Sequence, residues 1–248
     1  MPVSLAAGVI DQWLRSHQPA VIFDFNGTLS DDEPILFDIF SKLFRTHLHW
    51  EMTPDDYRDE LLGRSDREIV EHAVNRHGRG TKDEVADLLQ LRHGVYKQRV
   101  ADDNPITDAT VELVKLLADN HIPMGIVTGA QRDDVVAVLK SSAAGELFSV
   151  LIAEEDVRNG KPHPEGFLTA AGLLHRRPED VLVFEDSVPG VRAALAAGMH
   201  CIAVAGRQPD PQLNAVAPAM VAELSPGLVG DALTNWRRAP GFPRRPAT

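Results

Sequence analysis

Short apolar runs alternate with stretches of helical periodicity along much of the chain. The first run, residues 20–25 (AVIFDF), lacks the apolar–polar alternation of a half-exposed strand. Such a run is typical of a strand buried on both faces of a parallel sheet. Further runs of this kind follow residue 105, each after a predicted helix. The predicted strands cover 122–128, 148–153, 180–186 and 199–205, and the predicted helices cover 107–119, 131–141, 164–174 and 188–197. This order predicts an α/β fold with a doubly wound, Rossmann-like parallel sheet.

The segment from residue 33 to residue 105 shows helical periodicity and no strand signal. Its predicted helices cover 33–48, 54–61, 66–77 and 82–100, and helix-start signals stand at Thr53-Pro54 and at Ser65. We therefore expect an all-helical cap domain over 33–105, inserted into a core made of residues 1–32 and 106–248. The tail beyond about residue 206 is rich in proline and has one helical stretch near 226–236. Its end, about 238–248, is expected to be disordered.

Polar side chains stand at the carboxyl ends of the predicted strands. They are Asp24 and Asn26 after the first strand, Thr128 and Gly129 after the second, Lys161 in the loop after the third, and Glu185 and Asp186 after the fourth. In a doubly wound sheet, ligands bind outside the carboxyl ends of the strands, where the strand order reverses. These groups are therefore expected to meet at one edge, although they are far apart in the sequence.

The chemistry of this set suits a phosphoryl group. A carboxylate such as Asp24 can attack phosphorus and form an aspartyl-phosphate. Both partners are anionic, and Mg²⁺ is a suitable counter-ion because it takes one or two carboxylates together with substrate oxygens. Asp24 and Asp186 would supply those carboxylates, with the backbone carbonyl of Asn26 as a third oxygen. Donors to the phosphoryl oxygens would be the Lys161 ammonium, the Thr128 hydroxyl and the amides of Gly27, Gly129 and Ala130.

Four segments, in this order along the chain, resemble the haloacid-dehalogenase superfamily. They are VIFDFNGTLSDDEP (21–34), VTGA (127–130), GKPHPEGF (160–167) and FEDSVPGVRAALAAG (184–198). The resemblance is to the branch with a helical cap after the first strand, which includes β-phosphoglucomutase, phosphoglycolate phosphatase and small sugar-phosphate phosphatases. It implies that Asp24 is the nucleophile, that Thr128 and Lys161 bind phosphate, and that Asp186 holds Mg²⁺ with Glu185 beside it.

The cap loop 61–69 (LLGRSDREI) resembles the loop that such caps dip into the active site. Arg64 or Arg67 is therefore expected to meet the anionic substrate. The resemblance as a whole implies a Mg²⁺-dependent hydrolase that acts on a small phosphorylated metabolite. A sugar phosphate, phosphoglycolate or an acyl phosphate would fit that description.

The first motif departs from the pattern of the family. Its phosphatases carry Asp-x-Asp, and here the second acid is Asn26. That acid normally protonates the leaving group and then activates water, and general acid–base catalysis contributes about 10²–10⁴-fold. The metal site is expected to persist, because the family uses only the backbone carbonyl at this position.

Several interpretations of Asn26 are open. The chain is a phosphatase that is slow, or whose substrate has a good leaving group, with Asp31, Asp32 or His163 as a substitute acid. Alternatively it cleaves a bond other than a phosphoester, or binds a phosphorylated ligand with little catalysis. A substitution introduced deliberately at position 26 is also compatible with the sequence. Mutase activity is disfavoured, because β-phosphoglucomutase relatives place a histidine twelve residues after the nucleophile, where this chain has Leu36.

Composition narrows the class of partner. The chain has 248 residues and a formal net charge of -11, which disfavours binding to nucleic acid or anionic membranes. It lacks an apolar stretch long enough for a membrane span, and its start does not have the pattern of a secretory signal. A cytoplasmic enzyme with a small-molecule substrate is therefore expected, with no prediction of its oligomeric state. The one cysteine, Cys201, lies in an apolar run and is expected to be a buried hydrophobic residue.

Overall fold

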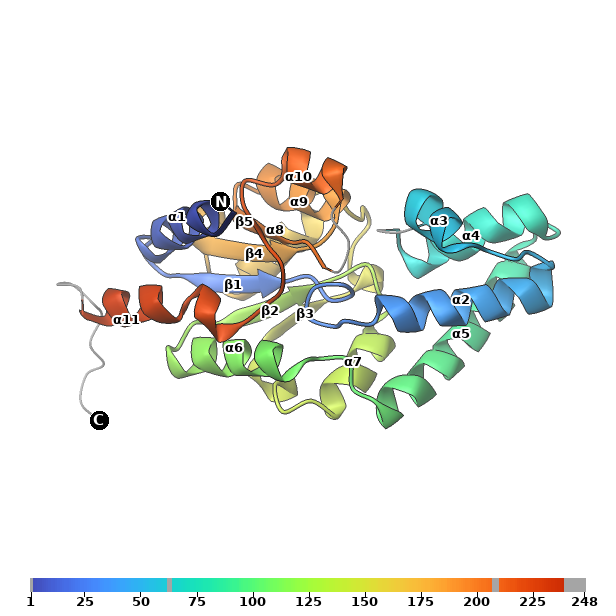
Figure 1. Ribbon diagram of the computed structural model, residues 1–248, viewed down its shortest axis with the longest axis horizontal. Helices are drawn as coiled ribbons and strands as arrows, with labels where there is room; N and C mark the ends of the chain where they lie inside the picture. Colours follow the sequence, from blue (N-terminus) through green and yellow to red (C-terminus); the bar gives the residue numbers. More distant parts are fainter. Residues whose placement is uncertain (1, 62–63, 207–209, 239–248) are drawn as a thin grey trace.

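The computed structural model describes residues 2–61, 64–206 and 210–238. Within these ranges the centre is a six-stranded parallel sheet in the spatial order β3-β2-β1-β4-β5-β6 (Figure 1). The strands are β1 (Ala20–Phe23), β2 (Met124–Val127), β3 (Val150–Ile152), β4 (Val181–Glu185), β5 (His200–Val204) and β6 (Met220–Val221). The order of strands reverses at β1, with β2 on one side and β4 on the other. The predicted doubly wound sheet is confirmed.

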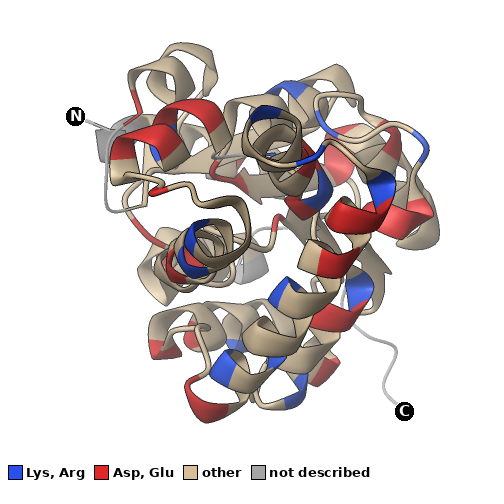
Figure 2. Ribbon diagram, turned by 90° about the vertical axis from the view of Figure 1, so that its right-hand side faces the viewer, with Lys and Arg blue, Asp and Glu red and all other residues tan. Residues whose placement is uncertain are grey.

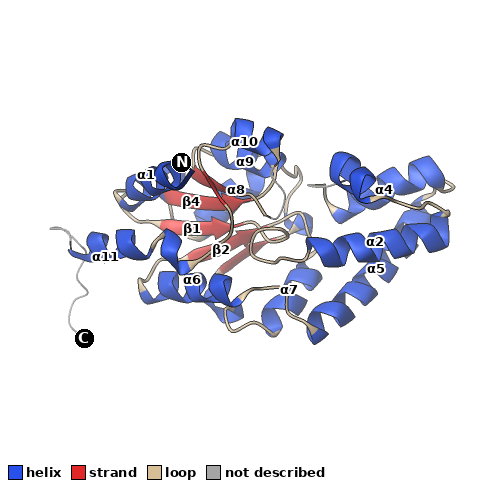
Figure 3. Ribbon diagram, viewed as in Figure 1, coloured by secondary structure: helices blue, strands red, loops and turns tan. Residues whose placement is uncertain are grey.

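Helices cover both faces of this sheet (Figure 3). One face packs against α1 (Pro2–Leu14), α6 (Asp108–Asp119), α7 (Arg132–Lys140) and α11 (Gly230–Arg238), and the other against α8 (Glu165–Leu173), α9 (Val188–Ala196) and α10 (Pro211–Val216). Alternate residues of β1 pack on opposite faces of the sheet. Val21 and Phe23 belong to one apolar cluster, and Ala20 and Ile22 belong to the other. This double burial explains why the strand reads as a continuous apolar run.

The chain between β1 and α6 forms a helical insertion with no strand among its described residues. It contains α2 (Glu33–Leu48), α3 (Pro54–Asp56) with a following π-helical turn (Tyr57–Leu61), α4 (Asp66–His77) and α5 (Lys82–Asp102). Thr53 and Ser65, the predicted helix starts, each form a capping box. The insertion lies beyond the carboxyl ends of the strands (Figure 1). The boundaries proposed for core and cap stay a prediction.

Two short elements near the end of the chain were not predicted. α10 and β6 lie in the proline-rich stretch after residue 206, where neither is long enough to show a periodicity. The helix expected near 226–236 is a 3₁₀ turn at Pro226–Leu228 followed by α11. Residues 239–248, expected to be disordered, lie outside the described residues. Cys201 is buried in the core as predicted. Among the described residues, no helix is both long and apolar enough to cross a membrane.

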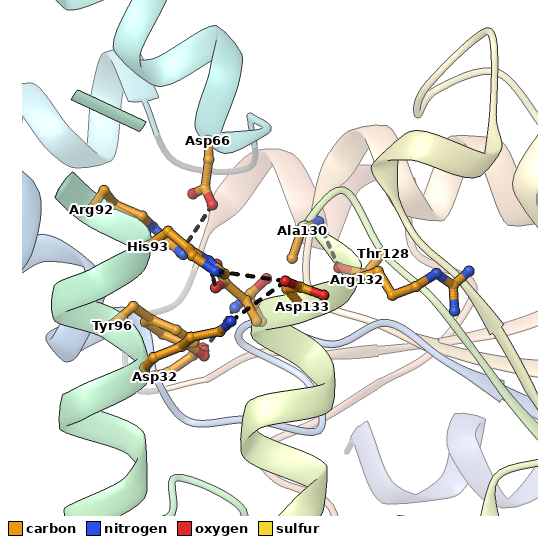
Figure 4. A network of polar contacts seen from close by, with 12 residues as sticks. Asp32, Asp66, Arg92, His93, Tyr96, Thr128, Ala130, Arg132 and Asp133 are labelled. Carbon is orange, nitrogen blue, oxygen red and sulfur yellow. Dashed lines mark hydrogen bonds and ion pairs between the residues drawn. The ribbon is translucent and has the colours of Figure 1, made fainter. Parts of the chain in front are cut away.

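A buried cation joins the insertion to the core (Figure 4). Arg92 of α5 is 2% exposed, and its guanidinium forms ion pairs with Asp66 at the start of α4 and with Asp134 of α7. His93 contacts the second oxygen of Asp134. The Arg92 guanidinium also lies 4.4 Å from the centroid of the Tyr96 ring. Two buried carboxylates on opposite sides of the junction therefore depend on one guanidinium.

Replacing Arg92 by methionine should lower the free energy of unfolding by about 3–5 kcal/mol, because it leaves two buried carboxylates without a counter-charge. Urea denaturation of both proteins measures the change. Arg99→Met is the matched control on the same helix, because Arg99 makes an exposed ion pair with Asp38, and such pairs contribute about 0–1 kcal/mol. Equal losses in the two variants would contradict a structural role for the buried pair of contacts.

Candidate active site

A cleft of about 580 Å³ lies between the carboxyl ends of the strands and the helical insertion. The strand ends and the loop before α8 contribute Asp24, Asn26, Thr128, Gly129, Ala130, Lys161 and Asp186 to its walls. The insertion contributes Glu33, Tyr57, Arg64, Ser65, Asp66 and Arg67, among others. Every site residue expected from the sequence lines this cleft except Gly27 and Glu185, which lie immediately behind the lining and contact residues that form it.

Three carboxylates meet at the core side of this cleft. One oxygen from each of Asp24, Glu185 and Asp186 lies within 4.8 Å of the others. The ammonium of Lys161 donates to Asp24 and to Glu185. The other oxygen of Glu185 accepts from the amide of Ser187 at 2.7 Å and from its hydroxyl at 2.9 Å. Glu185 is therefore occupied on both oxygens, and it holds Lys161 in place beside Asp24.

The electrostatics of the cluster favour an added cation. Burial raises the pKa of Asp24 to about 7, a shift that Lys161 opposes and the charge of Glu185 increases. Burial, together with Asp24 and Glu185, raises the pKa of Asp186 well above its usual range. Burial would lower the pKa of Lys161, but the two carboxylates that it contacts outweigh this effect and raise it. One ammonium thus faces three carboxyl groups, and a divalent cation beside Asp24 and Asp186 would balance the charge.

Gly27 has a structural role in this arrangement. Its φ of 76° is in the left-handed region, and a Cβ at this position would lie 2.0 Å from Oδ2 of Asp186. Its amide donates to the carbonyl of Ser30 at 2.8 Å, so it does not face the cleft as a free donor. Only glycine allows the Asp186 carboxylate to approach the loop after β1 so closely.

Two of the predicted phosphate donors, Thr128 and Ala130, form a hydrogen bond with each other. Thr128 follows β2 directly, and its hydroxyl oxygen accepts from the amide of Ala130 at 3.0 Å. This contact leaves the hydroxyl hydrogen of Thr128 available for an anion, while the Ala130 amide is already bonded. Of the donors predicted for phosphoryl oxygens, Thr128, Gly129 and Lys161 line the cleft, and their contact with phosphate stays a prediction.

Asn26 points its amide toward a buried acid. Nδ2 donates to Oδ2 of Asp32 at 2.7 Å, and the hydroxyl of Tyr96 donates to the same oxygen. Asp32 is fully buried, which raises its pKa, whereas the bonds from Tyr96 and Asn26 lower it. Neither Asp32 nor the exposed Asp31 is among the residues that line the cleft, whereas His163 is. Asp32 therefore orients Asn26 and does not face a substrate itself.

The insertion brings cations to the opposite wall. Arg64 and Arg67 both line the cleft and are exposed. Arg67 lies 3.9 Å from Glu71 on its own helix and 4.0 Å from Glu154 on the core side. Figure 2, which looks onto this end of the molecule, shows basic and acidic residues interspersed on it. The expectation that these two arginines approach the site is compatible with their positions, and their contact with substrate stays a prediction.

Sequence reasoning did not assign a role to Glu33, the first residue of α2. It lines the cleft, and its Oε2 accepts from the hydroxyl of Tyr57 at 3.0 Å. Burial raises the pKa of Glu33 to about 7, the charge of Asp32 adds to the shift, and Tyr57 opposes it. In the sequence, an acid followed by Pro34 has the pattern of a helix start, so nothing there marked it as a cleft residue.

Comparisons with known proteins agree with the fold. The family model for haloacid dehalogenase-like hydrolases matches residues 21–204. Validoxylamine A 7'-phosphate phosphatase of Streptomyces hygroscopicus subsp. limoneus is 31% identical over 182 residues, which are 73% of this chain and 83% of that protein. Hexitol phosphatase A of Escherichia coli is 30% identical over 196 residues, covering 79% and 87% of the two chains. Among solved structures, a CbbY mutant from Rhodobacter sphaeroides in complex with xylulose 1,5-bisphosphate has a TM-score of 0.72 and 25% identity, covering 83% and 94%.

Proposed function

Because the chain belongs to the haloacid dehalogenase-like hydrolase family, we propose that it is a Mg²⁺-dependent phosphatase that acts through a phosphorylated Asp24. The observation that carries this proposal is the meeting of Asp24, Asp186 and Lys161 at one end of the cleft. An attacking carboxylate, a second carboxylate and a fixed ammonium are the groups that phosphoryl transfer to aspartate requires.

Asp24, Asp186 and the backbone carbonyl of Asn26 would hold the Mg²⁺, which when bound supplies positive charge that offsets repulsion between carboxylate and phosphate. Lys161 binds the phosphoryl oxygens, and Glu185 keeps its ammonium beside Asp24. The hydroxyl of Thr128 donates to the same oxygens. Asp24 then attacks phosphorus in line with the leaving group, and water later releases phosphate from it.

The cleft and the relatives together indicate the class of substrate. One of the two phosphatases is named for validoxylamine A 7'-phosphate and the other for hexitols, and the CbbY mutant was solved in complex with xylulose 1,5-bisphosphate. Around the phosphoryl site of this chain, the walls offer Arg64, Arg67 and Glu33 as polar contacts. We propose a small sugar phosphate or polyol phosphate as substrate, with the arginines of the insertion closing over it.

Release of inorganic phosphate from a panel of sugar, polyol, aryl and acyl phosphates tests this function. With Mg²⁺ present, at least one member should be turned over, and a chelator of divalent cations should stop the reaction. Readdition of Mg²⁺ should restore it. Release that continues unchanged with chelator would contradict the metal requirement. Saturable binding of a sugar phosphate without any release would favour the alternative of a ligand-binding protein. The observation behind that alternative is that an amide, Asn26, stands where the phosphatases of the family have an acid.

A further inference from the structure

The proposed reaction lacks a proton donor at the expected place. When Asp24 bonds to phosphorus, the ester oxygen leaves as an alkoxide unless it receives a proton. The amide of Asn26 does not supply one, and it is bonded to Asp32. A sugar or polyol phosphate has a poor leaving group, so another acid in the cleft is needed for efficient turnover of such a substrate.

Most other acids of the cleft are committed to structural contacts. Asp66 is paired with Arg92, and Glu68 accepts the Ser65 amide in a capping box. Glu155 accepts the amide of Arg132, and Glu154 lies opposite Arg67. His163 lines the cleft but is exposed, and its ring lies 3.8 Å from Glu165.

Glu33 differs from these groups in three respects. It lies in the wall of the cleft, it stands where the loop from Asp24 enters α2, and a neutral hydroxyl is its bonded partner. The groups with the largest effect on its pKa are Asp32 beside it, the Tyr57 phenol, Asp66 of α4 and Asp24 after β1, and Asp186 and Glu33 also influence one another. The cations Arg64 and Arg67 line the same cleft. Asp32 and Asp66, which are not among the residues proposed to hold Mg²⁺, both disfavour a negative charge on Glu33.

We propose that Glu33 is the catalytic acid that protonates the leaving group, in place of the acid that Asn26 replaces. This inference rests on the proposed phosphatase function. As an oxygen of Asp24 bonds to phosphorus, the bond from phosphorus to the ester oxygen breaks. The ester oxygen takes the proton from Oε of Glu33, which leaves an alcohol and a Glu33 carboxylate. Solvent water returns the proton after the alcohol departs.

The test varies the leaving group while keeping the rest of the substrate similar. A series of phenyl phosphates with substituents of graded electron withdrawal gives kcat/KM, which reports the phosphorylation step, as a function of the acidity of the phenol. In Glu33→Gln, kcat/KM for the least acidic phenol should fall about 10²-fold, and for nitrophenyl phosphate it should fall far less. A residue that only bound substrate would shift the whole series equally.

The pH dependence supplies a second readout. With the Glu33 pKa near 7, kcat/KM for a poor leaving group should decline as pH rises through that value, because the proton donor is lost. Tyr57→Phe removes a bond that stabilises the ionised carboxyl, so it should raise the pKa of Glu33 and move the decline to higher pH. Asp38→Asn is the matched control, because Asp38 is a partly exposed acid on the same helix that pairs with Lys42, and this variant should leave the profile unchanged.

The outcomes separate this inference from the proposed function. One outcome would overturn only the role of Glu33. In it, the unaltered protein hydrolyses the series, Glu33→Gln lowers kcat/KM by the same factor for every phenyl phosphate, and Tyr57→Phe does not move the pH profile. The phosphatase function would then stand with another acid. If the unaltered protein releases phosphate from no substrate, both proposals are overturned. In an Asn26→Asp background, Glu33→Gln should be less damaging, because two acids would then be available.

Discussion

Replacing Asp24 by asparagine is expected to reduce phosphate release at least about 10⁴-fold, the scale seen when a covalent nucleophile is removed. Asparagine retains the shape of the side chain and an oxygen that can accept from Lys161, but it has no anionic oxygen to attack phosphorus. The measurement is kcat with saturating substrate and Mg²⁺. Activity within tenfold of the unaltered protein would rule out Asp24 as the nucleophile.

The same variant should remain folded. The raised pKa of Asp24 means that its ionised form is disfavoured by the folded protein, and the neutral amide removes that penalty. For an acid with a raised pKa, the penalty grows as pH rises above the unfolded value, so the variant should gain most stability at neutral pH and above. Urea denaturation at pH 5 and pH 8 provides this control and separates loss of chemistry from loss of fold.

Changing Asn26 to aspartate should raise kcat by about 10²-fold or more, because it restores an acid–base group at the position that the family uses. The same change should also affect stability. The new carboxyl would face Asp32, whose oxygen now accepts from the Asn26 amide at 2.7 Å. Two carboxyl groups at that distance share one proton, so the variant should lose about 1–3 kcal/mol of stability through the broken buried hydrogen bond.

The exchanged pair Asn26→Asp with Asp32→Asn tests both parts of this prediction. An amide at position 32 can donate one hydrogen to the new acid and the other to the Tyr96 oxygen, so the contacts are kept with their direction reversed. The exchanged variant should have the higher kcat without the loss of stability. A kcat equal to that of the unaltered protein in both variants would show that the amide at position 26 does not limit the reaction.

The site residues at strand ends could be anticipated because a general rule places them. Parallel strands present their carboxyl ends on one edge, so Asp24, Thr128 and Asp186 could be grouped from the sequence although they follow three different strands. The continuous apolar runs gave the strands for a similar reason, since double burial leaves no alternation. The helix start at Ser65 could also be predicted, because a capping box depends only on residues that are close in the sequence.

Residues whose role depends on a distant partner could not be predicted in this way. Arg92 sits on a helix with polar neighbours, and its partner Asp134 is on another element of the core. The pKa of Glu33 depends on the hydrogen bond from Tyr57 and on the charge of Asp24, which come from other parts of the chain. The amides of Gly27 and Ala130 were expected to face phosphate, but each is bonded within its own turn. Such choices are settled by backbone geometry that sequence patterns do not specify.

The residue that receives the phosphoryl group can be identified directly. The protein is mixed with substrate and Mg²⁺, quenched in acid during turnover, and digested, and the mass of the peptide that contains Asp24 is measured. If Asp24 is the nucleophile, this peptide should carry one added phosphoryl group on Asp24, which accumulates because the amide of Asn26 does not activate water. Steady turnover with no phosphoryl group on Asp24, or with the group on another residue, would contradict that role.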